Sequence, residues 1–228
     1  MPDRKIALVA GASRGIGLGL VEAFLARGWR VIGTQRGASA TGLAALPQER
    51  LVVETLDVAD PASVEALRLR LSGGRLDALF VNAGILDEPQ KPIGETDAAV
   101  FLRLMEVNAF GALRVVEALH ALAPDGSVVG AMSSGLGSLA RNESGGYEAY
   151  RASKAALNMM MRSFSARAGK GRAAVVIDPG WVRTDMGGSE APLSVADSAP
   201  KIVDVLIGEM GRSGPARFLN YRGETVPW

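Results

Sequence analysis

The chain has 228 residues, of which 48% are hydrophobic and 21% charged, and this balance excludes an intrinsically disordered protein. Its 25 lysines and arginines nearly offset 24 aspartates and glutamates, so the formal net charge of +1 argues against a nucleic-acid partner that needs a basic surface. Cysteine is absent, which excludes disulfides and thiolate metal sites. Neither a signal-peptide core nor a membrane-spanning apolar run is present, so we expect a cytoplasmic protein with no membrane partner.

Short apolar runs rich in β-branched residues alternate with amphipathic segments from one end of the chain to the other. The runs are apolar on both faces, as is typical of parallel strands covered by helices on both sides. The sequence therefore predicts an α/β fold with a doubly wound, mostly parallel seven-stranded sheet, in a single domain over residues 1–228. The predicted strands are 5–11, 30–35, 51–57, 76–84, 126–134, 173–180 and 216–221.

The helical patterns between these runs carry end signals. The apolar face that follows the first strand stops at Gly28, and glycine commonly ends helices. Asp60 as a helix cap and Pro61 as a first helical residue predict a helix that runs to Leu71. The other predicted helices are 96–122, 150–168 and 194–211.

The first predicted strand leads directly into the loop Gly11-Ala12-Ser13-Arg14-Gly15-Ile16-Gly17 and then into a helix. Gly11 permits a tight turn, Gly15 a close approach to a pyrophosphate, and Gly17 close contact between helix and strand. The free N–H groups at a helix N-terminus also favour phosphate. A purely structural glycine turn is the alternative, but the strand–loop–helix context favours a dinucleotide site.

The second predicted strand ends in Gly33-Thr34-Gln35-Arg36, without the carboxylate that holds the ribose 2′-hydroxyl in NAD sites. Arg36 offers a planar fork for a 2′-phosphate, and Arg14 could reach the same group from the glycine loop. Both arginines could instead be merely solvated. Because two arginines can converge at a strand end that lacks the carboxylate typical of NAD sites, the sequence favours NADP(H) over NAD(H).

Polar and small residues follow the third and fourth predicted strands, at the edge of the sheet where ligands bind in such folds. Asp57, next to Val58, could accept a hydrogen bond from the adenine amino group. The run Asn82-Ala83-Gly84 leaves room for the cofactor. Each could equally be an ordinary turn, because Asp, Asn and Gly favour turns.

Tyr150 and Lys154 are four residues apart in a predicted helix, so they share one helix face. A phenol titrates near pH ~10 and transfers protons poorly at neutral pH. We expect the Lys154 ammonium, helped by the cation of the oxidised nicotinamide, to lower the pKa of Tyr150 and make it a usable general acid. A solvated helix start is the alternative. Tyr147 has no lysine at this spacing and could be a pocket wall or a hydrophobic clasp.

Several motifs, in this order, resemble the short-chain dehydrogenases/reductases, which are single-domain Rossmann-fold oxidoreductases. They cover essentially the whole chain: AGASRGIG (10–17), LDV (56–58), VNAG (81–84), VNAFGAL around Asn108, MSSGLGS (132–138), YRASKAALN (150–158) and PGWVRTDMGG (179–188). The segment 138–149 and the ending 218–228 are similar to a subgroup that includes sniffer-type carbonyl reductases and the C-factor signalling protein.

The resemblance implies four catalytic residues: Asn108, Ser134, Tyr150 and Lys154. Tyr150 would exchange the proton, Lys154 would also bind the nicotinamide ribose, Ser134 would orient the carbonyl, and Asn108 would hold a helix kink and a proton-relaying water. Ser134 is preferred to Ser133 because the family has a glycine three residues after the active serine, and Gly137 fits. The two serines should also point to opposite faces of their strand.

The expected cofactor contacts combine the loop, the strand ends and the residues implied by the resemblance. They are Gly11, Ser13, Arg14, Gly15, Ile16, Gly17, Arg36, Asp57, Val58, Asn82, Ala83, Gly84, Tyr150, Lys154, Pro179, Gly180, Val182 and Thr184. Trp181 could wall the substrate pocket or simply pack. The Gly, Ser, Ala and Pro content of 185–200 suggests a mobile, open lid that admits apolar carbonyls.

The implied activity is reversible, NADP(H)-dependent reduction of an aldehyde or ketone to an alcohol. The implied partners are a small carbonyl or alcohol substrate and further copies of the chain, as a homodimer or homotetramer. We expect no metal, since His120 is the only histidine and no ligand motif accompanies it. Two alternatives stay open: a cofactor-binding signalling or sensor protein of C-factor type, and a dehydratase or epimerase on the same scaffold.

Overall fold

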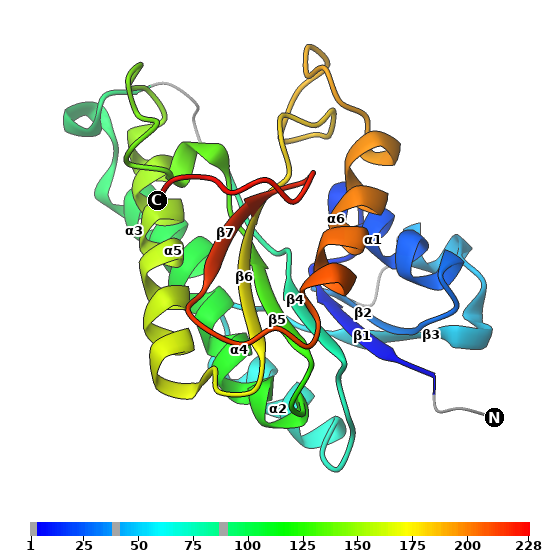
Figure 1. Cartoon of the computed structure of the whole chain (residues 1–228). Helices are drawn as coiled ribbons and strands as arrows, with labels where there is room; N and C mark the ends of the chain where they lie inside the picture. Colours follow the sequence, from blue (N-terminus) through cyan, green and yellow to red (C-terminus); the bar gives the residue numbers. More distant parts are fainter. Residues whose placement is uncertain (1–3, 38–41, 87–90) are drawn as a thin grey trace.

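The computed structural model describes residues 4–37, 42–86 and 91–228. In these residues a seven-stranded sheet has the order β3-β2-β1-β4-β5-β6-β7, and every neighbouring pair is parallel (Figure 1). The predicted Rossmann-type, doubly wound α/β fold is confirmed. The strands are β1 (Ile6–Ala10), β2 (Arg30–Gln35), β3 (Leu51–Thr55), β4 (Ala78–Val81), β5 (Val128–Met132), β6 (Ala173–Asp178) and β7 (Arg217–Asn220).

Longer helices and a π-helical turn accompany the sheet. They are α1 (Gly15–Ala26), α2 (Pro61–Arg70), α3 (Ala98–Met105), the π turn η4 (Glu106–Gly111), α4 (Ala112–Leu119), α5 (Glu148–Ala168) and α6 (Val195–Glu209). Single 3-10 turns are η1 (Gly42–Ala45), η2 (Gln48–Arg50), η3 (Ile93–Glu95), η5 (His120–Leu122) and η6 (Gly135–Gly137). No helix in the described ranges is long and apolar enough to cross a membrane.

Each face of the sheet carries its own apolar core, because successive strand residues point to opposite sides. In β1, Ala7 and Val9 pack with α1 and α6, whereas Leu8 and Ala10 pack with α2, α4 and α5. Figure 1 shows α1 and α6 on one side of the strands and α4 and α5 on the other. The apolar runs of the sequence are therefore covered on both faces, as expected.

The strand order reverses between β1 and β4, since the chain runs outward through β2 and β3 before it returns to β4. At such a switch point the loops after the two strands diverge to opposite faces and leave a crevice at the carboxyl edge of the sheet. The glycine loop follows β1, and Asn82-Ala83-Gly84 follows β4. The fold thus brings two of the predicted motifs to one crevice.

Helix caps explain most of the helix boundaries. The Asp60 carboxylate accepts a hydrogen bond from Ala62 N at 2.9 Å, with Pro61 as the first helical residue, as predicted. Ser194 and Asp197 form a capping box at the start of α6. The predicted helix 150–168 begins earlier, at Glu148, because Tyr147 takes a left-handed conformation and forms the boundary.

The predicted helix 96–122 is not continuous. A π-helical turn, η4, separates α3 from α4, and a 3-10 turn ends the segment. Gly111 explains part of this geometry, because a Cβ there would lie 2.7 Å from the carbonyl oxygen of Val58 and 2.9 Å from that of Glu106. The turn displaces the chain around Asn108, which agrees with the kink expected at this residue.

Gly111→Ala should therefore destabilise the protein by about 1–3 kcal/mol, because the added methyl group overlaps two backbone oxygens. Gly208→Ala in α6 is the matched control. Apart from the backbone of its own helix, no atom of the described residues lies within 4 Å of the place that this methyl group would take. Helix propensity should then leave the control equally or slightly more stable. Urea unfolding measures both free energies, and equal effects of the two substitutions would contradict the packing argument for η4.

Candidate active site

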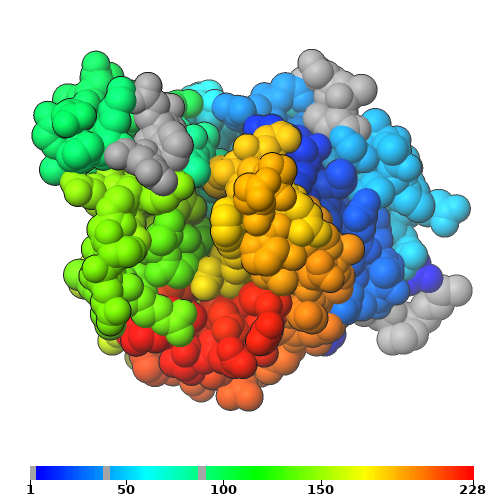
Figure 2. Space-filling model, turned by 90° about the horizontal axis from the view of Figure 1, so that it is seen from above, coloured from blue at the N-terminus to red at the C-terminus, as the bar shows by residue number. Residues whose placement is uncertain are grey.

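A cleft of about 370 Å³ lies at the switch point, along the carboxyl ends of the strands. It is bordered by the glycine loop, by the ends of β2, β3, β4 and β5, by the start of α5, and by the segment after β6. Figure 2 views this edge from above, with the segment after β6, in gold and orange, standing over it between the blue and the green parts of the chain.

The glycine loop is held by contacts that leave no space for side chains. Gly11 has φ +84°, and a Cβ on it would lie 2.7 Å from the Cα of Ala83. A Cβ on Gly17 would lie 2.1 Å from the carbonyl oxygen of Gly11. That oxygen accepts a hydrogen bond from Asn82 Nδ2 at 2.8 Å. The glycines therefore let the loop sit directly against the end of β4.

The N-terminus of α1 opens onto this cleft. Its cap residue, Arg14, makes no side-chain hydrogen bond to the first turn, and the first turn carries no acidic residue. Backbone N–H groups with these properties suit a phosphate, since neither a cap nor a carboxylate competes for them. The shape of the loop and the donors of the helix thus fit the pyrophosphate of a dinucleotide.

Most of the expected cofactor residues border this cleft. They are Gly11, Ser13, Arg14, Gly15, Ile16, Arg36, Asp57, Val58, Asn82, Ala83, Gly84, Tyr150, Lys154, Pro179 and Thr184. Gly17, Gly180 and Val182 are not among the residues that line it. Gly17 is buried beneath the loop, and Val182 is 3% exposed and forms a β-bridge with Leu193, so both serve the framework of the site.

The two arginines proposed for a 2′-phosphate differ in their surroundings. Arg36 is exposed at the end of β2 and lines the cleft. Arg14 also lines the cleft, but its guanidinium forms an ion pair with the Asp185 carboxylate. This pair joins the glycine loop to the segment after β6 across the cleft. Arg14 is thus engaged by a carboxylate, which sequence reasoning did not anticipate.

Asp57 makes the turn contact that the sequence offered as one alternative, and its role toward adenine stays a prediction. One carboxylate oxygen accepts a hydrogen bond from Ala59 N at 2.9 Å, which is a turn contact. Its own N–H donates to the Ser63 hydroxyl at 2.9 Å. Because Asp57 also lines the cleft, the turn fixes the side chain at the ligand-facing edge.

Ser134, Tyr150 and Lys154 meet where β5 ends and α5 begins. The Ser134 hydroxyl lies near enough to the Tyr150 phenol to lower its pKa. Lys154 Nζ lies 5.6 Å from the centre of the Tyr150 ring and donates to the carbonyl oxygen of Met132 at 2.9 Å. Lys154 is only 3% exposed, whereas Tyr150 is half-buried and open to the cleft.

The protein surroundings act on these two groups in a way that the sequence did not predict. Burial raises the pKa of Tyr150 to about 12, with a smaller opposing effect from its hydrogen bond to Ser134 and a further increase from the negative charge of Asp178. Burial also lowers the pKa of Lys154 to about 8. The expected lowering of the Tyr150 pKa by Lys154 is therefore wrong for the protein alone, because desolvation of the phenol has the largest effect and raises the pKa.

Asn108 lies fully buried in the π turn and uses its amide to hold neighbouring segments. Nδ2 donates to the carbonyl oxygen of Ile85 at 2.9 Å and to Ser153 Oγ at 3.0 Å, while Oδ1 accepts from Ile85 N at 2.8 Å. A Cβ on Gly84 would lie 3.3 Å from both Asn108 Oδ1 and Lys154 Nζ. The asparagine thus braces the chain beside the lysine.

Ser133 and Ser134 face different partners, as strand alternation predicts. The Ser133 hydroxyl donates to Asn158 Oδ1 at 2.6 Å, and Asn158 Nδ2 donates to the carbonyl oxygen of Gly137 at 3.1 Å. Ser134 caps η6 by accepting a hydrogen bond from Leu136 N at 3.2 Å. The arrangement leaves Ser134, and not Ser133, paired with Tyr150.

The profile described as short chain dehydrogenase matches residues 5–192 of this sequence. The chain belongs to this family. Family membership identifies the protein as an oxidoreductase enzyme, as the motifs indicated. Among curated proteins, the C-signal protein of Myxococcus xanthus is 39% identical over 168 residues, which are 72% of this chain and 100% of that protein.

Two solved structures extend the similarity to nearly the whole chain. A short-chain dehydrogenase/reductase from Burkholderia multivorans, crystallised with bound NADP, is 49% identical with a TM-score of 0.96, and the match covers 99% of this chain and 100% of that one. Carbonyl reductase Sniffer of Drosophila melanogaster is 31% identical with a TM-score of 0.90, and the match covers 99% of both chains. The expected resemblance to the sniffer-type and C-factor subgroup is confirmed.

Several residues around the cleft were not singled out from the sequence. Thr34 holds the glycine loop, since its Oγ1 accepts from Gly11 N at 3.0 Å and its carbonyl oxygen from Ala12 N at 2.7 Å. Asn158 holds the serine segment, and its position four residues after Lys154 was a usable signal. The other unexpected lining residues include Gln35, Ile85, Arg103, Arg183, Asp185 and Met186.

The buried Lys154 should cost this enzyme stability. An amine whose pKa is about 8 when folded, against an ordinary value of 10.5, binds fewer protons in the folded state between these pH values. The contribution of Lys154 to the free energy of unfolding is thus lowest below pH 8, and it rises as the pH increases toward 10.5. Lys154→Met should raise the free energy of unfolding at pH 7 by about 1–3 kcal/mol, and the gain should shrink by pH 10.

Urea unfolding at both pH values measures this difference. Lys170→Met is the matched control, because Lys170 is exposed and its replacement should change stability by less than about 0.5 kcal/mol. A Lys154→Met protein that is less stable than the wild type at pH 7 would show that the bond from Lys154 to Met132 outweighs the cost of desolvation.

Proposed function

We propose that the protein is an NADP(H)-dependent oxidoreductase that reduces an aldehyde or ketone to an alcohol, reversibly. The observation that carries the proposal is that Tyr150 and Lys154 line the same cleft as the glycine loop, with Ser134 beside Tyr150. Proton exchange and dinucleotide binding therefore have adjoining places in one cleft. Carbonyl reduction needs both. Ser133, and not Ser134, is itself among the residues that line this cleft.

The donor set of the cleft fits a nicotinamide dinucleotide. The N–H groups of the first turn of α1 suit the pyrophosphate, and the crowded Gly11 and Gly17 leave the loop close to the strand ends. Arg36 would hold a 2′-phosphate, and the Burkholderia multivorans relative was crystallised with NADP. When bound, the nicotinamide supplies or accepts the hydride.

Tyr150 would give its proton to the substrate oxygen. A pKa of about 12 keeps the phenol protonated at neutral pH, so Tyr150 holds the proton that reduction needs, although as a weak acid. The positive charges of Lys154 and of a bound oxidised nicotinamide would lower this pKa and favour the transfer. In the direction of oxidation the phenolate would be needed, which the same pKa disfavours below alkaline pH. Ser134, whose hydroxyl lies beside the Tyr150 phenol, would orient the carbonyl oxygen.

Lys154 and Asn108 would support this exchange. Lys154 would bind the nicotinamide ribose and hold positive charge near the phenol. Its hydrogen bond to the carbonyl oxygen of Met132 would weaken when it does so. The amide of Asn108 fixes Ile85 and braces the chain beside Lys154. We propose that Asn108 acts in the proton relay by holding this geometry.

A signalling role is the second candidate, because C-signal of Myxococcus xanthus is 39% identical to this chain. In that case cofactor binding and a partner surface would matter more than turnover. The arrangement of Tyr150 with Ser134 favours catalysis, since a binding protein has no need for a proton donor there. A dehydratase or epimerase would leave NADPH unconsumed during turnover.

We also propose that copies of the chain associate as a homodimer or homotetramer. Large apolar side chains are exposed on adjoining helical segments, with Leu102 of α3 64% exposed, Phe110 of η4 55% and Met159 of α5 66%. The segments α3 and η4 both contact α5, so these side chains lie on connected elements.

The cytoplasmic location expected from the sequence also stays a prediction.

Tyr150→Phe tests the proposed reaction. The variant should lose at least about a hundredfold in kcat for NADPH-dependent carbonyl reduction, because the proton donor is removed while the ring remains. NADPH binding, followed by nicotinamide fluorescence, should persist. Wild-type protein that binds NADPH but oxidises it with no member of a broad carbonyl panel would overturn the reductase proposal. If Tyr150→Phe keeps the biological effect of the wild-type protein, this result would support the signalling role.

Arg36→Ala tests cofactor choice. The substitution should weaken NADPH binding by about tenfold or more and leave NADH binding nearly unchanged, because only NADPH carries the 2′-phosphate. Arg14→Ala is the comparison, and a smaller effect is expected because Asp185 already engages that guanidinium. Equal losses for NADPH and NADH in Arg36→Ala would contradict the assignment of Arg36 to the 2′-phosphate.

A further inference from the structure

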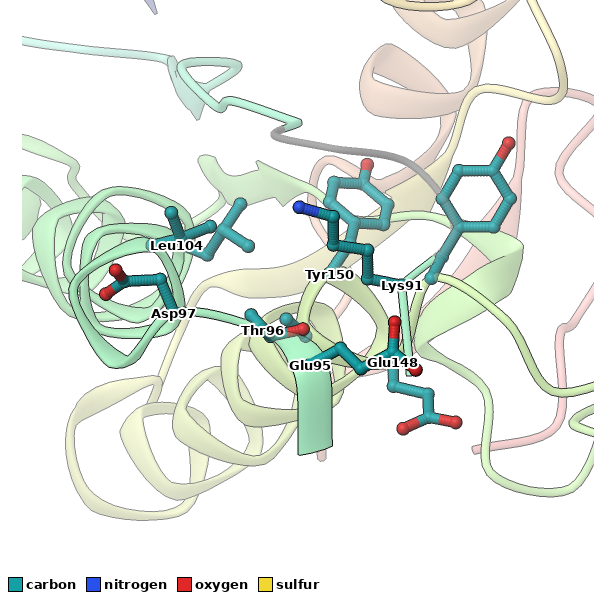
Figure 3. A pocket seen from close by; sticks show the side chains of 10 residues that line it. Lys91, Glu95, Thr96, Asp97, Leu104, Glu148 and Tyr150 are labelled. Atoms are coloured by element: carbon teal, nitrogen blue, oxygen red, sulfur yellow. The ribbon is translucent and has the colours of Figure 1, made fainter. Parts of the chain in front are cut away.

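A second pocket of about 320 Å³ shares Tyr150 with the cofactor cleft. One side is formed by the segment from Lys91 through η3 to Leu104 of α3, and the other by residues 147–150 at the start of α5. Figure 3 shows Leu104 and Asp97 on one side and Tyr150 and Glu148 on the other. A carbonyl that reaches the Tyr150 phenol can therefore place the rest of its molecule here.

Tyr147 lines this pocket from a costly backbone conformation. Its φ and ψ are 52° and 34°, and among the described residues it is the one residue other than glycine with a positive φ. A bulky residue rarely adopts this left-handed conformation, which costs free energy and occurs most often at functional sites. Asparagine or glycine would fit the backbone better.

The neighbouring contacts hold Tyr147 in this conformation. Arg151 Nε donates to the carbonyl oxygen of Gly146 at 2.8 Å, and its Nη2 donates to that of Gly145 at 2.9 Å. On the other side, Ile93 N donates to Glu148 Oε2 at 2.8 Å, which ties the start of α5 to the opposite wall of the pocket. The backbone of the half-buried Tyr147 is thus held at the pocket, three residues before Tyr150.

We propose that Tyr147 is a specificity-determining residue, whose ring packs against a planar, aromatic group attached to the substrate carbonyl. The inference rests on the proposed reduction at Tyr150 and names the class of substrate that the adjoining pocket selects. A tyrosine has only two side-chain torsions, so its ring can bind another ring with little loss of side-chain freedom. Val100 and Leu104 supply apolar surface in the same pocket.

The charges around the pocket restrict the class further. Of the residues that the structure describes, three with carboxylates, Glu95, Asp97 and Glu148, line it together with one ammonium, that of Lys91. An anionic substrate would meet this excess of negative charge beside Tyr150, and like charges disfavour binding at short range. The pocket therefore favours neutral aromatic carbonyl compounds over those that carry a carboxylate.

Two neutral ketones of similar size, acetophenone and cyclohexyl methyl ketone, test the role of Tyr147. The ratio of their kcat/KM values, measured with saturating NADPH, should fall by about tenfold in Tyr147→Leu and stay within about twofold of the wild type in Tyr147→Phe. The comparison between variants cancels the difference in reactivity of the ketones. An unchanged ratio in Tyr147→Leu would overturn the proposal.

Tyr147→Gly is a second variant that removes the ring while relieving the backbone. We expect a higher denaturation midpoint than in the wild type, together with the same loss of preference for acetophenone. A variant that keeps the wild-type preference would exclude Tyr147 as the determinant. A merely structural role for the tyrosine would change stability and leave the ratio of the two ketones unaltered.

Binding without turnover separates this inference from the proposed reaction. In saturation-transfer NMR with the NADP⁺-bound protein, acetophenone should bind more tightly than cyclohexyl methyl ketone to the wild type and to Tyr147→Phe, but not to Tyr147→Leu. This result would support the pocket assignment even if no carbonyl were reduced. Equal binding of both ketones to the wild type would overturn it.

A third ketone, 4-acetylbenzoate, tests the charge of the pocket. Its kcat/KM should be at least about tenfold below that of acetophenone at low salt, and the gap should narrow as salt screens the carboxylates. Equal kcat/KM values for the two compounds at low salt would overturn the restriction to neutral substrates.

Discussion

The burial of the Lys154 ammonium is the constraint around which the site is arranged. A cation that is 3% exposed needs an acceptor and enough space, and it obtains the acceptor from the carbonyl oxygen of Met132 at the end of β5. The space depends on Gly84, because a side chain there would lie 3.3 Å from Lys154 Nζ. The lysine, the strand end and the glycine turn after β4 therefore have to be in place together.

The same constraint connects the fold with the chemistry. Lys154 and Tyr150 share a helix face, and both line the cleft at the point where the strand order reverses. The desolvation that lowers the pKa of the lysine to about 8 also raises that of the phenol to about 12. The protein thus keeps a protonated tyrosine beside the place where a substrate oxygen would lie, at the expense of some stability.

Local patterns in the sequence were sufficient to predict the strands and the helix cap, because these elements are determined by residues that are close together in the chain. Apolar runs predicted all seven strands, since parallel strands buried on both faces leave a clear signal. The Asp60 cap was visible because a cap and its partner are close in the chain. The spacing of Tyr150 and Lys154 also placed both side chains correctly at one cleft.

Features that depend on contacts between distant segments could not be predicted in this way. The π turn at Asn108 depends on hydrogen bonds to Ile85 and Ser153, and the pairing of Arg14 depends on Asp185, far along the chain. The pKa of Tyr150 depends on the volume of protein around it, which spacing does not reveal. Tyr147 takes the left-handed conformation although tyrosine is unfavourable there and two glycines precede it. Residue propensity would have placed this conformation at a glycine, so the sequence did not reveal it at Tyr147.

The ion pair between Arg14 and Asp185 has a kinetic consequence. It spans the cleft between the glycine loop and the segment after β6, and both side chains are largely exposed, at 71% and 74%. Exposed ion pairs of this kind contribute little free energy, so the pair between Arg14 and Asp185 separates readily in water. A dinucleotide would therefore enter and leave by parting two surface side chains, without local unfolding, and salt would speed the exchange.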